Sequence, residues 1–215
     1  MAKNPLEQRS YNFEVRAEET ENGHIITGRP IVYASRTDLG WFDEIIEPGA
    51  LDQADLTDVR FLVNHDTRKI PLARSRRNNG NSTMLLSVDQ FGLNLDRVNL
   101  DTENNTEARA LYSAVQRGDI SGMSFMFSID DEEWEDLESD HPTRHIRKIG
   151  SVVEVSAVTF PAYESTEINA RSKEALENAR SALESARQQT ATSVETDELE
   201  LAKAKFKFRS KLGGN

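Results

Sequence analysis

The alternation of apolar and polar residues predicts a chain built mainly from short strands between residues 12 and about 160. In residues 12–17, Phe13 and Val15 alternate with polar neighbours, and residues 25–33 form a second apolar stretch after a turn-like ENG sequence. These two stretches are expected to pair as a hairpin. Repeated short strands separated by turn residues are typical of a barrel or a sandwich.

A second hairpin and a helix are expected next. Residues 83–88 and 92–100 flank the sequence Asp-Gln-Phe and predict two paired strands. In residues 106–117 the apolar spacing changes to i, i+3, i+4, i+7, which indicates an amphipathic helix. Gly118 follows it and can end the helix in a left-handed conformation. Helices are therefore the minority in this region.

The remaining strands carry polar residues with possible chemistry. Residues 59–63 are a short apolar run that ends just before His65. Residues 120–129 predict a strand, and the chain is expected to return through 144–149 and 152–160 after an acidic loop over 130–140. Site residues often lie where a strand gives way to a loop, which is the position of His65.

The composition changes after residue 163. Residues 174–189 have high helix propensity but only a narrow stripe of small apolar residues, which favours a solvated or weakly self-associating helix. Residues 203–211 alternate basic with apolar or small residues and predict an extended basic tail. The expected organisation is a flexible N-terminus (1–11), one domain (12–163), a helical segment (164–189), and a linker with the tail (190–215).

Charge and cysteine content exclude several classes of function. The net charge is −11 across 215 residues, which argues against a nucleic-acid partner, since such proteins usually carry a basic surface. Without cysteine there are no disulfides, thiolate metal ligands or cysteine nucleophile. No stretch approaches the length of a membrane span, so no membrane association is expected. Hydroxyl, carboxylate and imidazole groups are left to carry any chemistry, and neither a cofactor nor a metal is expected.

A hydrolase without cysteine needs an activated hydroxyl and a base. Among the four histidines, only His65 follows a strongly apolar strand. From its position alone, a structural role for His65 as a hydrogen-bonded histidine is the commoner explanation. Ser124 lies in the sequence SGMSFMF (121–127), where alternation places it on the face opposite Met123 and Phe125. On this evidence alone, serines lining a half-solvated face are favoured.

Glu154 occupies the most strand-like stretch of the chain, VVEVSAVTF (152–160). A carboxylate buried there needs a cation or a donor, because an unpaired buried charge is costly. A histidine is one such partner, as in a catalytic triad, and an ion pair with Arg147 or Lys148 is the other. Ser156 shares the face of Glu154 and could support it by a hydrogen bond.

Together, three motifs resemble the caudoviral prohead protease family. They are LVNHD (62–66), SGMSFMF (121–127) and VEVSAVTFPA (153–162), in this order and with the predicted helix between the first two. The sequences GRPIVY (28–33) and FDEIIEPGA (42–50) resemble the start of the same family. The resemblance spans residues 12 to about 163.

The resemblance implies a fold and the roles of three residues. The fold would be mainly β with helices (α+β), an assemblin-like small β-barrel surrounded by helices, followed by a helical and disordered C-terminal tail. Ser124 matches the nucleophile, His65 the general base, and Glu154 the acidic third member. Ser121 is the rival nucleophile, and His145 is the alternative third member because the herpesvirus relatives use a second histidine there.

The resemblance also implies partners and a location. As a serine endopeptidase the chain would cleave the scaffolding segment of the major capsid protein and its own chain, with assembly into a homo-oligomer as a further expectation. It would act in the host cytoplasm, packaged inside the procapsid. Two alternatives stay open: a non-enzymatic scaffold or assembly protein, and an unrelated hydrolase that uses His65 with Asp66.

Overall fold

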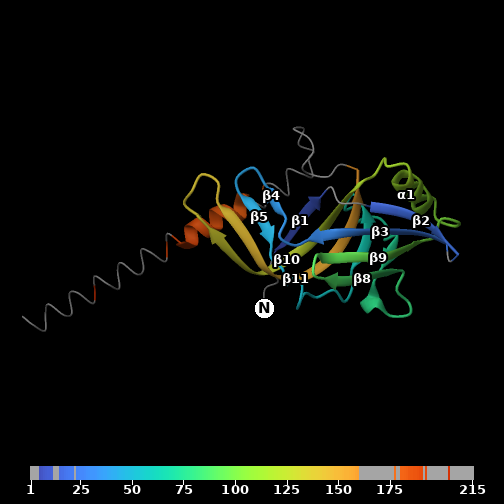
Figure 1. Cartoon of the computed structure of the whole chain (residues 1–215), viewed down its shortest axis with the longest axis horizontal. Helices are drawn as coiled ribbons and strands as arrows, with labels where there is room; N and C mark the ends of the chain where they lie inside the picture. Colours follow the sequence, from blue (N-terminus) through green and yellow to red (C-terminus); the bar gives the residue numbers. More distant parts are fainter. Residues whose placement is uncertain are drawn as a thin grey trace, which may run out of the picture.

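The computed structural model describes residues 5–11, 15–21, 23–159 and 180–190, together with residues 177, 192 and 203. Its strands form two sheets (Figure 1). The first has the order β1 (Leu6–Tyr11), β10 (Gly122–Glu135), β11 (Thr143–Val158), β5 (Asp43–Ile46), β4 (Arg36–Asp38), with β6 (Arg60–Val63) paired to β11 and β7 (Ala73–Arg74) paired to β6. The second has the order β2 (Val15–Thr20), β3 (Gly23–Val32), β9 (Gly92–Leu100), β8 (Met84–Asp89). A 3₁₀ turn, η1 (Arg76–Asn78), precedes β8.

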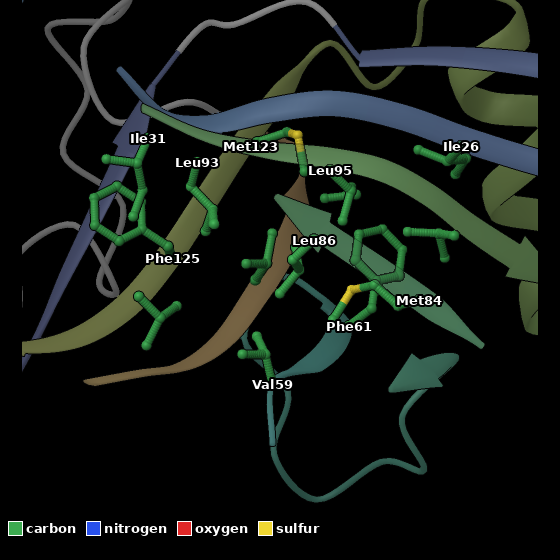
Figure 2. Packing of buried hydrophobic residues seen from close by; sticks show 14 of the residues in the cluster. Ile26, Ile31, Val59, Phe61, Met84, Leu86, Leu93, Leu95, Met123 and Phe125 are labelled. Carbon is green, nitrogen blue, oxygen red and sulfur yellow. The ribbon is translucent and has the colours of Figure 1, made fainter. Parts of the chain in front are cut away.

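The main hydrophobic core gathers side chains from both sheets. Figure 2 shows Phe125 of β10 close to Ile31 and Leu93 of the second sheet, and Met123 of β10 close to Leu95. All five side chains are fully buried. Burying a side chain of this size stabilises a fold by roughly 1.5–3 kcal/mol, so this layer holds β10 firmly in place.

Both predicted hairpins and the predicted helix are confirmed. β2 pairs with β3 and β8 pairs with β9, each antiparallel. Helix α1 (Thr106–Gln116) lies beside β2 (Figure 1) and buries the predicted apolar stripe. Asn105 caps its first turn by accepting hydrogen bonds from two backbone N–H groups, and Gly118 follows its end with φ +79°.

The mainly β prediction with helices is confirmed, but a closed barrel is not found among the described residues. The two sheets share no strand pairing in the described part of the chain. Strand β11 uses one edge twice, because β5 pairs with residues 143–146 and β6 with residues 154–157. These strands extend the first sheet along β11 rather than joining it to the second.

Two predictions for polar segments are wrong. The acidic loop over 130–140 is shorter than expected, because β10 continues to Glu135. Ion pairs across the hairpin, Glu132 with Arg144 and Glu133 with Arg147, offset the repulsion between its carboxylates. The N-terminus, expected to be flexible over 1–11, contains strand β1, which pairs with β10 along its whole length.

The C-terminal helical segment is packed rather than solvated where it is described. Residues 180–190 are helical, and Leu183 is buried with Leu39 and Phe42 beside the β10–β11 hairpin. Arg187 fixes this contact by donating to the carbonyl of Leu137 at 3.0 Å. Within the described residues, no helix is long and apolar enough to cross a membrane. The first part of the predicted helical segment, residues 164–176, and the basic tail apart from Lys203 lie outside the described residues.

Candidate active site

His65 lies just beyond the end of β6, in an unusual backbone conformation. Asn64 and His65 have φ values of 51° and 56°, in the left-handed region that Asn and His enter more readily than most residues. The Asn64 N–H donates to the carbonyl of Ala157 at 2.9 Å, and its side chain is held by Thr159 of the same neighbouring segment. The turn thus aims the imidazole back over the sheet.

Strand β11 supplies the groups that orient His65. The Nδ1 atom of His65 lies 2.5 Å from Oε2 of Glu154, which is almost fully buried. Ser156, two residues further along the same face, accepts a hydrogen bond from the His65 N–H at 3.0 Å and donates to the other carboxylate oxygen of Glu154. The carboxylate acceptor favours the tautomer with the proton on Nδ1, which leaves Nε2 free to accept.

Ser124 completes a continuous line of hydrogen bonds. It lies directly opposite Ser156 in the β10–β11 register, and its Oγ is 2.5 Å from Nε2 of His65. Strands β10 and β11 and the turn after β6 therefore bring together Ser124, His65 and Glu154, the three residues to which the resemblance assigns roles. A hydroxyl, an imidazole and a carboxylate in this order can transfer a proton from the hydroxyl and stabilise the resulting imidazolium.

The rival residues lie elsewhere in the described structure. Ser121 is exposed before β10 and makes no hydrogen bond to His65 among the described contacts. His145 bonds through Nδ1 to Glu47 at 2.6 Å and so does not meet His65. Asp66 accepts hydrogen bonds from Arg68. This geometry supports neither a His65–Asp66 pair nor His145 as third member.

Sequence reasoning missed a buried group of charges that attaches β1 to the first sheet. This charge cluster consists of the buried residues Glu7, Arg9, Glu44 and Arg144 and the half-buried Glu132. Arg9 binds Glu44 through Nε at 2.5 Å and Nη2 at 2.6 Å, and Arg144 binds both oxygens of Glu7 at 2.9 Å. Burial alone would raise the pKa of Glu7, but attraction and hydrogen bonds from Arg9 and Arg144 lower it to about 2. A strand with charged buried side chains has no hydrophobic alternation, and so gave no recognisable signal.

One group of described residues has a geometry suited to a metal. Ligand atoms of Asp38, Asp43 and His141 lie within 4.8 Å of one another. Asp43 already binds Arg36 at 2.7 Å and His141 at 3.2 Å. Burial raises its pKa, yet these hydrogen bonds lower it overall below the ordinary value. The charge of this carboxylate is therefore already balanced by side chains.

Comparison with known proteins agrees with the geometry of the site. A search of curated proteins and a search of solved structures each returned no match. The family model of the caudovirus prohead serine proteases matches residues 11–181, about four fifths of the chain and all three residues of the hydrogen-bonded line. On this match, the chain belongs to the caudovirus prohead serine protease family.

Proposed function

We propose that this chain is the endopeptidase that cleaves the scaffolding segment of the major capsid protein, and its own chain, inside the procapsid. Membership of the family supports a prohead serine protease. The observation that carries the residue assignment is the line Ser124 Oγ–His65 Nε2, His65 Nδ1–Glu154 Oε2, with 2.5 Å at both steps. A buried line of this kind is costly to maintain, which argues against a purely structural role for these residues.

Ser124 is the proposed nucleophile and His65 the base. The hydroxyl proton passes to Nε2 of His65 as Oγ attacks the carbonyl carbon of the cleaved peptide bond. The same proton is then given to the leaving amine, and an acyl-enzyme remains on Ser124. Water, activated by His65, releases the acyl group and restores the hydroxyl.

Glu154 and Ser156 have distinct proposed roles. Glu154 stabilises the imidazolium that forms during attack and holds the proton of the free histidine on Nδ1. Ser156 is a positioning residue, because it binds both the Glu154 carboxylate and the backbone N–H of His65. Together they fix the imidazole in two directions, which is what proton transfer at hydrogen-bond distance requires.

The proposal is tested by co-expressing the chain with the capsid precursor and measuring the masses of both proteins in purified proheads. Wild type is expected to trim the precursor, and Ser124→Ala is expected to leave it intact. Ser121→Ala is the matched control and should behave as wild type. If the precursor stays intact with wild type, the non-enzymatic scaffold is favoured. If only Ser121→Ala loses cleavage, Ser121 is the nucleophile instead of Ser124.

A further inference from the structure

Strand β1 covers the proposed nucleophile. Ser10 of β1 lies directly opposite Ser124 of β10, and the Ser124 side chain is fully buried. The Ser10 hydroxyl donates to Ser124 Oγ at 2.7 Å, and Ser124 Oγ donates to the carbonyl oxygen of Arg9 at 2.6 Å. A substrate therefore has no route to the hydroxyl while β1 remains paired with β10.

The contact with β1 also diverts the proton that catalysis needs. A serine hydroxyl carries one hydrogen. The Arg9 carbonyl and Nε2 of His65 lie 2.6 and 2.5 Å from the same Oγ, so they compete for it. When the hydrogen points to the carbonyl, His65 cannot accept it, and Ser124 is not activated. Strand β1 thus blocks access and base catalysis together.

The side chain of Arg9 shows what a replacement strand must provide. Its guanidinium is almost fully buried, makes two hydrogen bonds to Glu44 and lies 5.7 Å from the ring centre of Phe127. Without β1, the pocket retains Glu44, Glu132 and Arg144, which together carry one net negative charge. A neutral side chain in place of Arg9 would leave Glu44 buried with too little compensation, whereas a basic side chain restores the balance.

We propose that β1 is a substrate mimic, held in the strand position on β10 that a substrate takes, with its arginine in the pocket for a substrate's basic side chain. This inference rests on the proposed function. The Arg9 carbonyl accepts the hydrogen bond from Ser124 Oγ at 2.6 Å, so it marks the bond that is cut, and the basic side chain belongs to the residue just before that bond. A substrate is then an extended segment with Arg or Lys at this position, and β1 must leave before it binds.

A reversible lock tests the displacement of β1. Gln8 and Met126 face each other across the β1–β10 pair, and the natural chain has no cysteine. In a Gln8→Cys/Met126→Cys chain the oxidised form is expected to cut the capsid precursor at least tenfold more slowly than the reduced form. The rate at which wild type cuts the precursor should not depend on the reductant. Equal cutting by oxidised and reduced chains would overturn the mimic while leaving the protease intact.

Mapping the cut sites by mass spectrometry tests the pocket. The residue before each cut in the precursor is expected to be Arg or Lys, and Glu44→Gln should slow cutting at these sites at least tenfold. Cuts that follow acidic or apolar residues would contradict the assignment of this pocket to a basic side chain, but would leave the proposed function intact. The mapping uses wild type, so it holds even if the Glu44 variant fails to fold.

Access to the nucleophile can also be measured without catalysis. In a Ser124→Cys chain, alkylation by iodoacetamide is expected to be slow. Adding Arg9→Gln, which weakens the attachment of β1, should speed it at least tenfold while the chain keeps a cooperative thermal transition. An unchanged rate would overturn the mimic. If Arg9→Gln speeds alkylation, but the corresponding chains that keep Ser124 never cut the precursor, the proposed function is overturned and the mimic is not.

Discussion

Replacing Glu154 with glutamine removes a charge from the candidate active site while keeping its shape. The carboxylate lies 2.5 Å from Nδ1 of His65, so the centres of the two charges are about 4 Å apart once the imidazolium forms. At an effective dielectric constant of about 20, a unit pair at this distance attracts by about 4 kcal/mol. Losing that attraction from the transition state corresponds to a fall in kcat of about a thousandfold.

The assay is the rate of capsid-precursor cleavage by wild type, Glu154→Gln and Asp66→Asn. Asp66→Asn is the matched control, because it also removes a carboxylate beside His65, but that carboxylate binds Arg68 rather than the imidazole. The effect of Glu154→Gln should appear in kcat, with KM little changed, because the imidazolium exists only during reaction. A loss below tenfold, or an equal loss in Asp66→Asn, would refute the role of Glu154.

Three further predictions concern stability. Gly92→Ala places a Cβ atom 2.0 Å from the carbonyl oxygen of Ile31 at a φ of +136°. It should lower the free energy of unfolding, measured in urea, by about 3 kcal/mol or more. Gly80→Ala, with open space around it, is the control, and a similar loss there would contradict the reasoning. The pKa of Glu7 falls from 4.5 to about 2 on folding, so its charge contributes roughly 3 kcal/mol above pH 4.5, lost as pH falls toward 2. Glu7→Gln should therefore be less stable than wild type at pH 6, with a much smaller difference near pH 2.5; a difference independent of pH would contradict this. Ser156→Ala leaves buried polar groups without a partner and should cost about 1–3 kcal/mol, checked by thermal unfolding, and an unchanged transition temperature would speak against its positioning role.

Local patterns predicted the elements that depend on local contacts. The β2–β3 and β8–β9 hairpins pair strands adjacent in sequence, and α1 carries its own cap and apolar stripe. Strand β1 could not be found this way. Its partner β10 is more than a hundred residues away, and its inward residues Glu7 and Arg9 are charged. The burial of these two charged side chains is stabilised by complementary charges on β5 and β11. The periodicity of the sequence does not indicate which distant charges will pair.

The candidate site was predictable in part. Alternation placed Ser124 away from the Phe and Met layer and placed Ser156 beside Glu154, and both relations hold in the structure. The meeting of His65 with Glu154 depends on the parallel pairing of β6 with β11, which spacing alone does not reveal. The resemblance supplied that connection. The burial of Ser124 was not expected, because it follows from β1.

The parallel pairing of β6 with β11 also sets when the site can exist during synthesis. Glu154 and Ser156 are made about ninety residues after His65, and both must reach the sheet before the imidazole has its partners. Strand β1, although it is made before β10, has no edge to join until β10 has been made. A nascent chain therefore cannot hold the complete line of Ser124, His65 and Glu154 until the last strand of the sheet, β11, has been made.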